Sequence, residues 1–120
     1  MQRYSLTTTL ILLIFTTPSE ARNIKEIIVD RKENQSDSLI FEQRVSAAAD
    51  AFAWTNEVLR KRGDAPLYCQ PRKLAVTKSQ AIQILEDGIA EDPELGSLPA
   101  GALNFALLQS LIKTFPCDGP

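Results

Sequence analysis

The most reactive side chains in this sequence are two cysteines, Cys69 and Cys117. A nucleophilic thiol normally needs a histidine beside it, and the chain contains no histidine. The same lack excludes a Ser-His-Asp triad and an imidazole metal site. A structural role for both cysteines is therefore favoured over a catalytic one, and no metal-binding residue is expected.

Paired carboxylates are the remaining candidates for acid–base chemistry. Glu86 with Asp87, and Glu91 with Asp92, are adjacent in the chain, but acidic residues at helix ends and in loops are usually solvated surface rather than a glycosidase-type pair. No GxGxxG or P-loop motif occurs, so no nucleotide cofactor is expected. The composition is typical of a protein that binds or blocks, not of an enzyme.

The N-terminal stretch MQRYSLTTTLILLIFTTPSEA has the three parts of a secretory signal. Arg3 supplies the positive start, an apolar centre follows, and Ser19-Glu20-Ala21 fits the small-x-small cleavage rule. The apolar centre is far shorter than the roughly 20 residues that span a bilayer. We predict a signal peptide over residues 1–21, cleavage after Ala21, and a periplasmic location without a membrane anchor.

The charge of the remaining chain is nearly balanced. Removal of Arg3 and Glu20 leaves 12 basic against 14 acidic side chains. This balance offers no basic patch for a phosphate backbone, so no nucleic-acid partner is expected. No later segment is apolar enough to span a membrane.

Export also decides what the two cysteines are expected to do. In an oxidising compartment two thiols usually form one disulfide. Closing Cys69 to Cys117 makes a loop of 49 residues, which the chain-entropy model values at about 4 kcal/mol. Because a small domain is stable by only about 5–15 kcal/mol, this disulfide would be a major contribution.

The elements that would hold these residues are helical. Residues 22–37 are interpreted as a polar leader, and Asp37 or Ser38 is expected to cap a long helix that Gly63 ends. Its expected buried face has a three- to four-residue spacing and consists of Phe41, Val45, Ala48, Phe52 and Leu59, widened by Ala49, Ala53 and Trp54.

A second helix is predicted to begin at Thr77, because Thr77 and Gln80 form a T-x-x-Q capping box. Pro93 must end it or closely follow its end. Its expected apolar face contains Ala81, Ile82, Leu85 and Ile89.

The last helix is expected to be capped by Ser97 and stopped by Pro116. One face should carry Leu103, Ala106, Leu107, Ser110 and Leu111, and Phe105, Leu108 and Ile112 extend its apolar surface. Deep burial, or a partner on the second face, would explain so wide an apolar surface. The predicted fold is a small all-α bundle of four to five helices with one disulfide, over residues 38–120.

Residues 67–117 carry five short motifs in a characteristic order and spacing. They are Tyr68-Cys69-Gln70-Pro71, Thr77 with Gln80, Asp92-Pro93-Glu94, Pro99-Ala100, and Phe115-Pro116-Cys117. In these motifs the stretch resembles the C-terminal half of the immunity proteins against type VI secretion amidases, also called resistance-associated proteins. The long helix lacks the further cysteines and the tyrosine-glycine step of many relatives.

The resemblance implies a periplasmic immunity protein, a small and often dimeric helical bundle that plugs the cleft of a peptidoglycan amidase. It carries over no catalytic residue. A second hypothesis is a periplasmic stress chaperone, which would bind unfolded clients through apolar surface. A third is a scaffold that has kept the domain without a toxin.

The partner-binding surface is predicted at the turn from Glu91 to Leu98, because prolines limit the entropy that the turn would lose on binding. No core stripe includes this turn, so substitutions within it should leave the fold intact. The alternative is a solvated connection, and the alternative for the basic helix end is C-terminal capping. The predicted residues are Glu91, Asp92, Glu94, Leu95 and Leu98, with Arg60 and Arg62 as the second choice.

Overall fold

The structure is a computed structural model that describes residues 22–118. The predicted signal peptide lies outside these residues. Within them the fold is all-α, as predicted, with five α-helices and no strand. The elements are α1 (Ile24–Asp30), α2 (Gln35–Lys61), α3 (Lys78–Glu91), α4 (Pro93–Ser97), the 3-10 turn η1 (Ala100–Ala102) and α5 (Leu103–Thr114).

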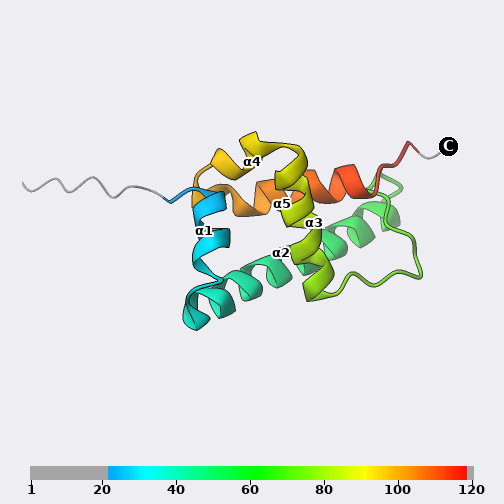
Figure 1. Cartoon of the computed structure of the whole chain (residues 1–120). Helices are drawn as coiled ribbons and strands as arrows, with labels where there is room; N and C mark the ends of the chain where they lie inside the picture. The colour runs from blue at the N-terminus through cyan, green and yellow to red at the C-terminus, as the bar shows by residue number, and fades with distance from the viewer. Residues whose placement is uncertain (1–21, 119–120) are drawn as a thin grey trace, which may run out of the picture.

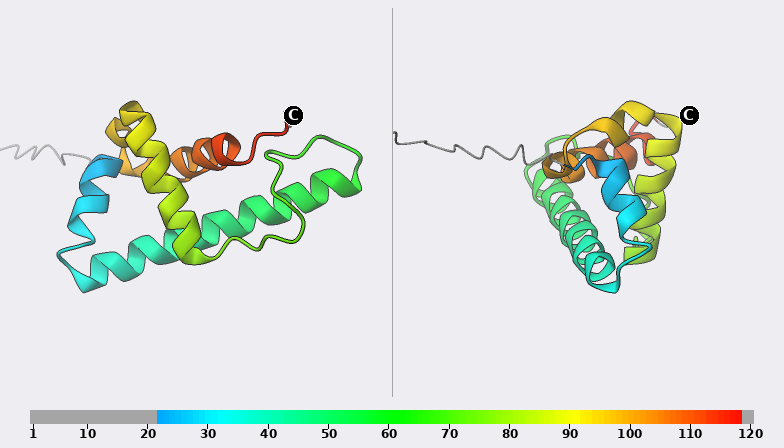
Figure 2. Two further views of the ribbon diagram at one scale, coloured as in Figure 1. Left: turned by 45° about the vertical axis from the view of Figure 1, so that its right-hand side comes forward. Right: turned by 60° about the vertical axis from the view of Figure 1, so that its left-hand side comes forward.

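The long helix α2 forms one side of the molecule, and the other elements lie on a single side of it (Figure 1). Helices α3 and α5 contact each other and both contact α2, while α1 contacts α2 and α4. The two rotated views show α1 joining the start of α2 to the region of α4 (Figure 2). The buried apolar core lies between these helices and contains Ile24, Phe41, Val45, Ala48, Tyr68, Ala81, Ile82, Leu85, Leu103, Ala106, Leu107 and Leu111.

Helix α2 begins earlier than expected and ends where expected. Asn34 is its cap, because Asn34 Oδ1 accepts from the backbone N–H of Ser36 at 2.9 Å. The expectation of a cap at Asp37 or Ser38 is therefore wrong. At the other end Gly63 has a φ of +76°, a left-handed conformation that glycine adopts without strain.

The inner face of α2 confirms most of its predicted core. Phe41, Val45 and Ala48 are buried, and Phe52 packs against the core from a half-buried position. Trp54 does not belong to this face, because 71% of it is exposed. Two residues correspond to about 200° around an α-helix, so a helix that buries Phe52 must direct Trp54 outward.

Helix α1 corrects the interpretation of residues 22–37 as a polar leader. Asn23 and Glu26 form a capping box, in which Asn23 Oδ1 accepts from Glu26 N–H at 2.8 Å. Ile24 is fully buried, and its N–H donates to Leu98 O at 2.9 Å. Asn23 also forms an isolated bridge with Pro99. This segment is a docked part of the domain.

The C-terminal half of the bundle follows the predicted faces but not every predicted boundary. Thr77 caps α3 through the expected box, with Thr77 N–H donating to Gln80 Oε1 at 2.9 Å. Ser97 does not cap the last helix; it ends α4, and η1 leads into α5 without a side-chain cap. The backbone of Leu98 and Pro99 is extended, with ψ near 150°. These two residues therefore separate α4 from η1 and the start of α5.

An ion pair inside the bundle joins α1 to α3. Arg31, at the C-terminal end of α1, pairs with Glu86 of α3, and their side chains are 15% and 26% exposed. The guanidinium lies 4.8 Å from the centre of the Phe41 ring on α2, a cation–π distance. Arg31 therefore links three helices.

The Cys69–Cys117 disulfide is present, as predicted, with a Cα–Cα distance of 4.8 Å. It ties the segment between α2 and α3 to the end of α5. Beside it Cys69 N–H donates to Phe115 O at 2.8 Å, and the ring of Tyr68 lies 6.3 Å from that of Phe115. A covalent bond, a backbone hydrogen bond and an aromatic contact thus fix the same junction.

Candidate interaction site

The predicted binding turn, residues 91–98, is a short helix and not an open loop. Asp92 connects α3 to α4 without an intervening linker, since its N–H still donates to Gly88 O at 2.9 Å. Its side chain caps α4 by accepting from Glu94 N–H at 3.2 Å. Pro93 occupies the first turn of α4, where its missing N–H is tolerated. The turn is therefore held by its own side-chain cap and by Pro93.

Three carboxylates lie on the surface of this turn. Glu91, Asp92 and Glu94 are all exposed, and we call them the acidic knob. Glu91 pairs with Lys113 of α5 at 2.5 Å, and both side chains are more than half exposed, so the pair contributes little to stability. The knob therefore presents negative charge on a fixed backbone.

The two leucines of the turn lie on its core side, away from the acidic knob. Leu95 and Leu98 are half-buried and pack against the core, and Leu98 O accepts from Ile24 N–H. The expectation that substitution at Leu95 would leave the fold intact is therefore wrong. These leucines support the backbone that carries the carboxylates.

The basic end of α2, the second predicted site, is partly neutralised within the chain. Arg60 pairs with Glu57 at 3.4 Å, and Arg62 pairs with Asp64 at 3.6 Å. Arg60 and Lys61 lie in the last turn, where cations favourably oppose the helix dipole. Both observations agree with the capping alternative for this cluster.

The two predicted regions do not form one site. The ribbon places α4 near α1, whereas the C-terminal end of α2 lies at the opposite end of the molecule (Figures 1 and 2). A partner of the acidic knob would not simultaneously contact Arg62 unless it extended along the whole bundle.

Comparisons with known families, with curated proteins and with solved structures find no match. Within residues 22–118 no group of three or more potential metal ligands is assembled. None of the helices described here combines the length and apolar character needed to cross a membrane.

Asn56 is a structural residue that the sequence analysis did not identify. It is 3% exposed, although it is an amide on a helix. Its Oδ1 accepts from Leu67 N–H at 2.7 Å, and its Nδ2 donates to Tyr68 O at 3.3 Å. Asn56 thereby satisfies the backbone of the chain segment that leads into the disulfide.

Tyr68, whose backbone carbonyl accepts from Asn56, is 2% exposed. Burial raises the pKa of its phenol above the ordinary value of 10.0, and the positive charge of Arg60 offsets part of this increase. Tyr68 is thus neutral through the physiological range and acts as a core residue.

A second feature missed in the sequence is an apolar surface on the outer side of α2. Its large members are well exposed: Ile40 at 61%, Trp54 at 71% and Val58 at 53%. The signal was present, because these residues are separated by 14 and 4 positions and so share one helical face. The sequence analysis instead placed Trp54, with Ala49 and Ala53, on the buried face of the helix, so the exposed apolar surface was not recognised.

Proposed function

We propose that this protein is a periplasmic immunity protein, which binds and blocks a peptidoglycan amidase of a type VI secretion system. The observation that carries this proposal is the acidic knob. It is a group of exposed carboxylates on a capped turn at one end of a disulfide-linked bundle. The resemblance of residues 67–117 to amidase immunity proteins names the kind of partner.

The physical basis is preorganisation. A cleft-filling element binds best when little conformational entropy remains to be lost. The Asp92 cap, Pro93 and the packed leucines restrict the α4 backbone before binding. Glu91, Asp92 and Glu94 would accept hydrogen bonds from donors around the amidase cleft, and in a water-excluded interface such charge-assisted bonds are strong.

The direct test is calorimetry of the purified protein with its proposed amidase partner. Glu94 is the residue to change, because it is exposed and its side chain forms no ion pair within residues 22–118. We expect Glu94→Lys to weaken binding at least about tenfold, or about 1.4 kcal/mol.

The matched control is Glu33→Lys, which reverses an exposed charge in the turn between α1 and α2. It should bind with the affinity of the unchanged protein. Equal affinity of both variants would remove the knob from the interface. No inhibition of the amidase by the unchanged protein would refute the proposed function itself.

A peptidoglycan assay distinguishes binding from catalysis. We expect the protein alone to release no fragments from peptidoglycan, and an equimolar amount to stop release by the amidase. Cleavage by the protein alone, lost on substitution of one of its own acidic residues, would instead identify an enzyme.

The exposed apolar surface of α2 favours a second candidate, a periplasmic stress chaperone. Chaperones of this kind bind apolar segments of many unfolded clients. Suppression of aggregation of unrelated proteins in strong acid, together with no stoichiometric partner at neutral pH, would support the chaperone over the immunity protein.

A further inference from the structure

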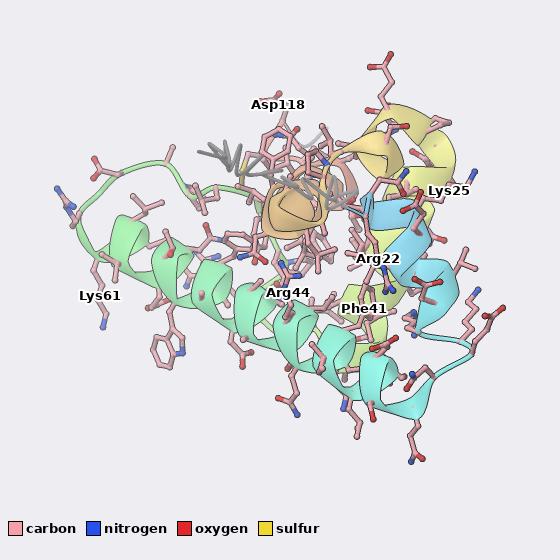
Figure 3. The ribbon with its side chains drawn as sticks, turned by 90° about the vertical axis from the view of Figure 1, so that its left-hand side faces the viewer. Arg22, Lys25, Phe41, Arg44, Lys61 and Asp118 are labelled. Atoms are coloured by element: carbon pink, nitrogen blue, oxygen red, sulfur yellow. A yellow bond between two sulfur atoms is a disulfide. The ribbon has the colours of Figure 1, made fainter. Side chains whose placement is uncertain are left out.

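Although the whole chain is nearly balanced in charge, a surplus of basic side chains lies at one end of the molecule. Residues 57–73, which cover the end of α2 and the start of the connector to α3, carry five basic and two acidic side chains. The rest of residues 22–118 carries seven basic and twelve acidic ones. Figure 3 shows Lys61 at this end, far from Lys25 of α1. The domain is therefore electrically polarised along its length.

Three of these cations surround one hollow in the surface, with a volume of about 450 Å³. Arg60 and Lys61 belong to the last turn of α2, and Arg72 belongs to the connector. Arg60 and Arg72 also line a smaller hollow next to it, so these two arginines lie together. Among the described residues Glu57 supplies the one carboxylate of the lining. We call the hollow lined by Glu57, Arg60, Lys61 and Arg72 the basic hollow.

Helix capping does not account for the whole of this arrangement. The backbone beyond α2 already satisfies carbonyls of its last turns, since Asp64 N–H donates to Leu59 O at 2.9 Å. The Arg60 guanidinium donates to Glu57, at the long distance of 3.4 Å. The helix dipole favours the two cations on α2, but it does not explain why Arg72, from a separate segment, joins them.

Arg72 is held in place by a closed turn. Leu74 N–H donates to Pro71 O at 3.0 Å, which makes Arg72 a central residue of a β-turn. The Gln70 side-chain amide donates to Leu74 O and braces the same turn. The disulfide of Cys69 ties the start of this segment to the chain beyond α5. Little backbone entropy would therefore be lost when a ligand binds to Arg72.

We propose that the basic hollow binds the phosphate group of a phosphate monoester, carried either by a small soluble molecule or by a lipid headgroup. Neither Lys61 nor Arg72 forms an ion pair within the described part of the chain. Their like charges share one hollow without a counterion, which is unfavourable. An anion placed there would relieve this repulsion.

The charge and shape of the lining select phosphate. Three cations face one carboxylate, so an anion with two negative charges matches the excess. A phosphate monoester carries about −1.5 to −2 charges near pH 7, whereas a single carboxylate carries one. The planar forks of Arg60 and Arg72 suit the bidentate recognition of phosphate oxygens.

The exposure of the lining sets the expected strength. Lys61 and Arg72 are exposed, and the Arg60 side chain is 33% exposed. Dissolved salt therefore screens their attraction for an anion. We expect a dissociation constant in the millimolar range at low ionic strength, and weaker binding as salt is added.

A titration with inorganic phosphate, followed by NMR, tests the site. At low ionic strength and near-neutral pH, phosphate should shift the backbone amide signals of residues 57–61 and 70–74 and reach saturation. Arg72→Gln and Lys61→Gln should each weaken binding several-fold, the loss expected for one exposed charge pair. Acetate, with one charge, should bind several-fold more weakly than phosphate, and equal affinities would overturn the assignment of a doubly charged ligand.

Lys73→Gln is the matched control. Lys73 is the exposed neighbour of Arg72 in the same turn, but it is not part of the lining of the basic hollow. This variant should keep nearly full affinity. Equal losses in Arg72→Gln and Lys73→Gln would show only a general attraction of anions to a basic surface and would overturn the site. The absence of any saturable shift would overturn it as well.

Two further probes distinguish the sources of the phosphate. Glycerol 3-phosphate is a soluble monoester, and phosphatidic acid in phosphatidylcholine vesicles carries the same group as a headgroup. Co-sedimentation with these vesicles, lost in Arg72→Gln and kept in Lys73→Gln, would assign the site to a lipid headgroup. Saturable shifts with glycerol 3-phosphate and no co-sedimentation would assign it to a soluble ester. Binding of neither probe would overturn the proposal, and inhibition of the amidase through the acidic knob, at the other end of the molecule, would be unaffected.

Discussion

Gly88 of α3 lies directly against Ser110 of α5. A β-carbon added at Gly88 would be 2.0 Å from Ser110 Oγ and 2.7 Å from Ser110 Cβ, well inside van der Waals contact. Ser110 Oγ meanwhile donates to Ala106 O at 2.8 Å. A glycine within a helix costs about 1 kcal/mol relative to alanine, and here the cost accompanies the close approach of two helices.

Gly88→Ala should therefore destabilise the protein, by about 1–3 kcal/mol from overpacking, although alanine is the better helix former. Urea denaturation measures the effect. Gly101→Ala is the control, since nothing lies within 4 Å of a β-carbon there, and it should be neutral or slightly stabilising. Equal midpoints for the two variants would contradict the helix contact.

Asn56→Ala should cost about 1–3 kcal/mol, because it leaves the backbone groups of Leu67 and Tyr68 buried without their partner. Thr55→Ala, on the exposed side of the same helical turn, should cost less than half as much. The free energy of unfolding of each variant gives the comparison, and a Thr55→Ala loss as large as that of Asn56→Ala would argue against the proposed bridging role.

Replacement of both Cys69 and Cys117 by serine should lower stability by about 4 kcal/mol, the value expected for a loop of this size. Before that, intact-mass analysis of the exported protein should show no uptake of an alkylating agent unless a reductant is added. Two alkylated thiols without reduction would show that the disulfide does not form in the cell.

Tyr68 should make stability fall with pH in the alkaline range. Because burial raises its folded-state pKa, the unfolded chain releases the phenol proton first, from about pH 10 upward. Stability is thus retained below that pH and is lost as the pH rises toward the folded pKa. Lysines titrate there too, so Tyr68→Phe is the comparison: its stability should decline less steeply between neutral and alkaline pH.

The sequence was most informative where a helix carried its own boundary signals. Thr77 and Gln80 lie three positions apart at the start of α3, and Gly63 stops α2; both signals were readable because capping depends on neighbouring residues alone. Asn23 and Glu26 offered the same kind of signal for α1, but seven residues are too few to make a helix by themselves. Its stability comes from burying Ile24 against residues far away in the sequence.

The candidate site was predictable only in its outline. The acidic residues on either side of Pro93 were visible in the sequence, and the structure shows them exposed. The burial of Leu95 and Leu98 depends on long-range contact with α1, and no local pattern encodes that contact. Asn56 was equally hidden, since a polar residue in a helix is usually solvated and only the fold shows which backbone groups it meets.

The disulfide has one more consequence, which concerns proteolysis. Cys69 and Cys117 close a covalent ring that contains α3, α4 and α5, so the acidic knob lies inside the ring. A protease that cuts the chain once near α4 would open the ring without releasing either piece. Under oxidising conditions the nicked protein should therefore migrate as one chain, separate into two fragments only on reduction, and need a second cut before any part of the knob is lost.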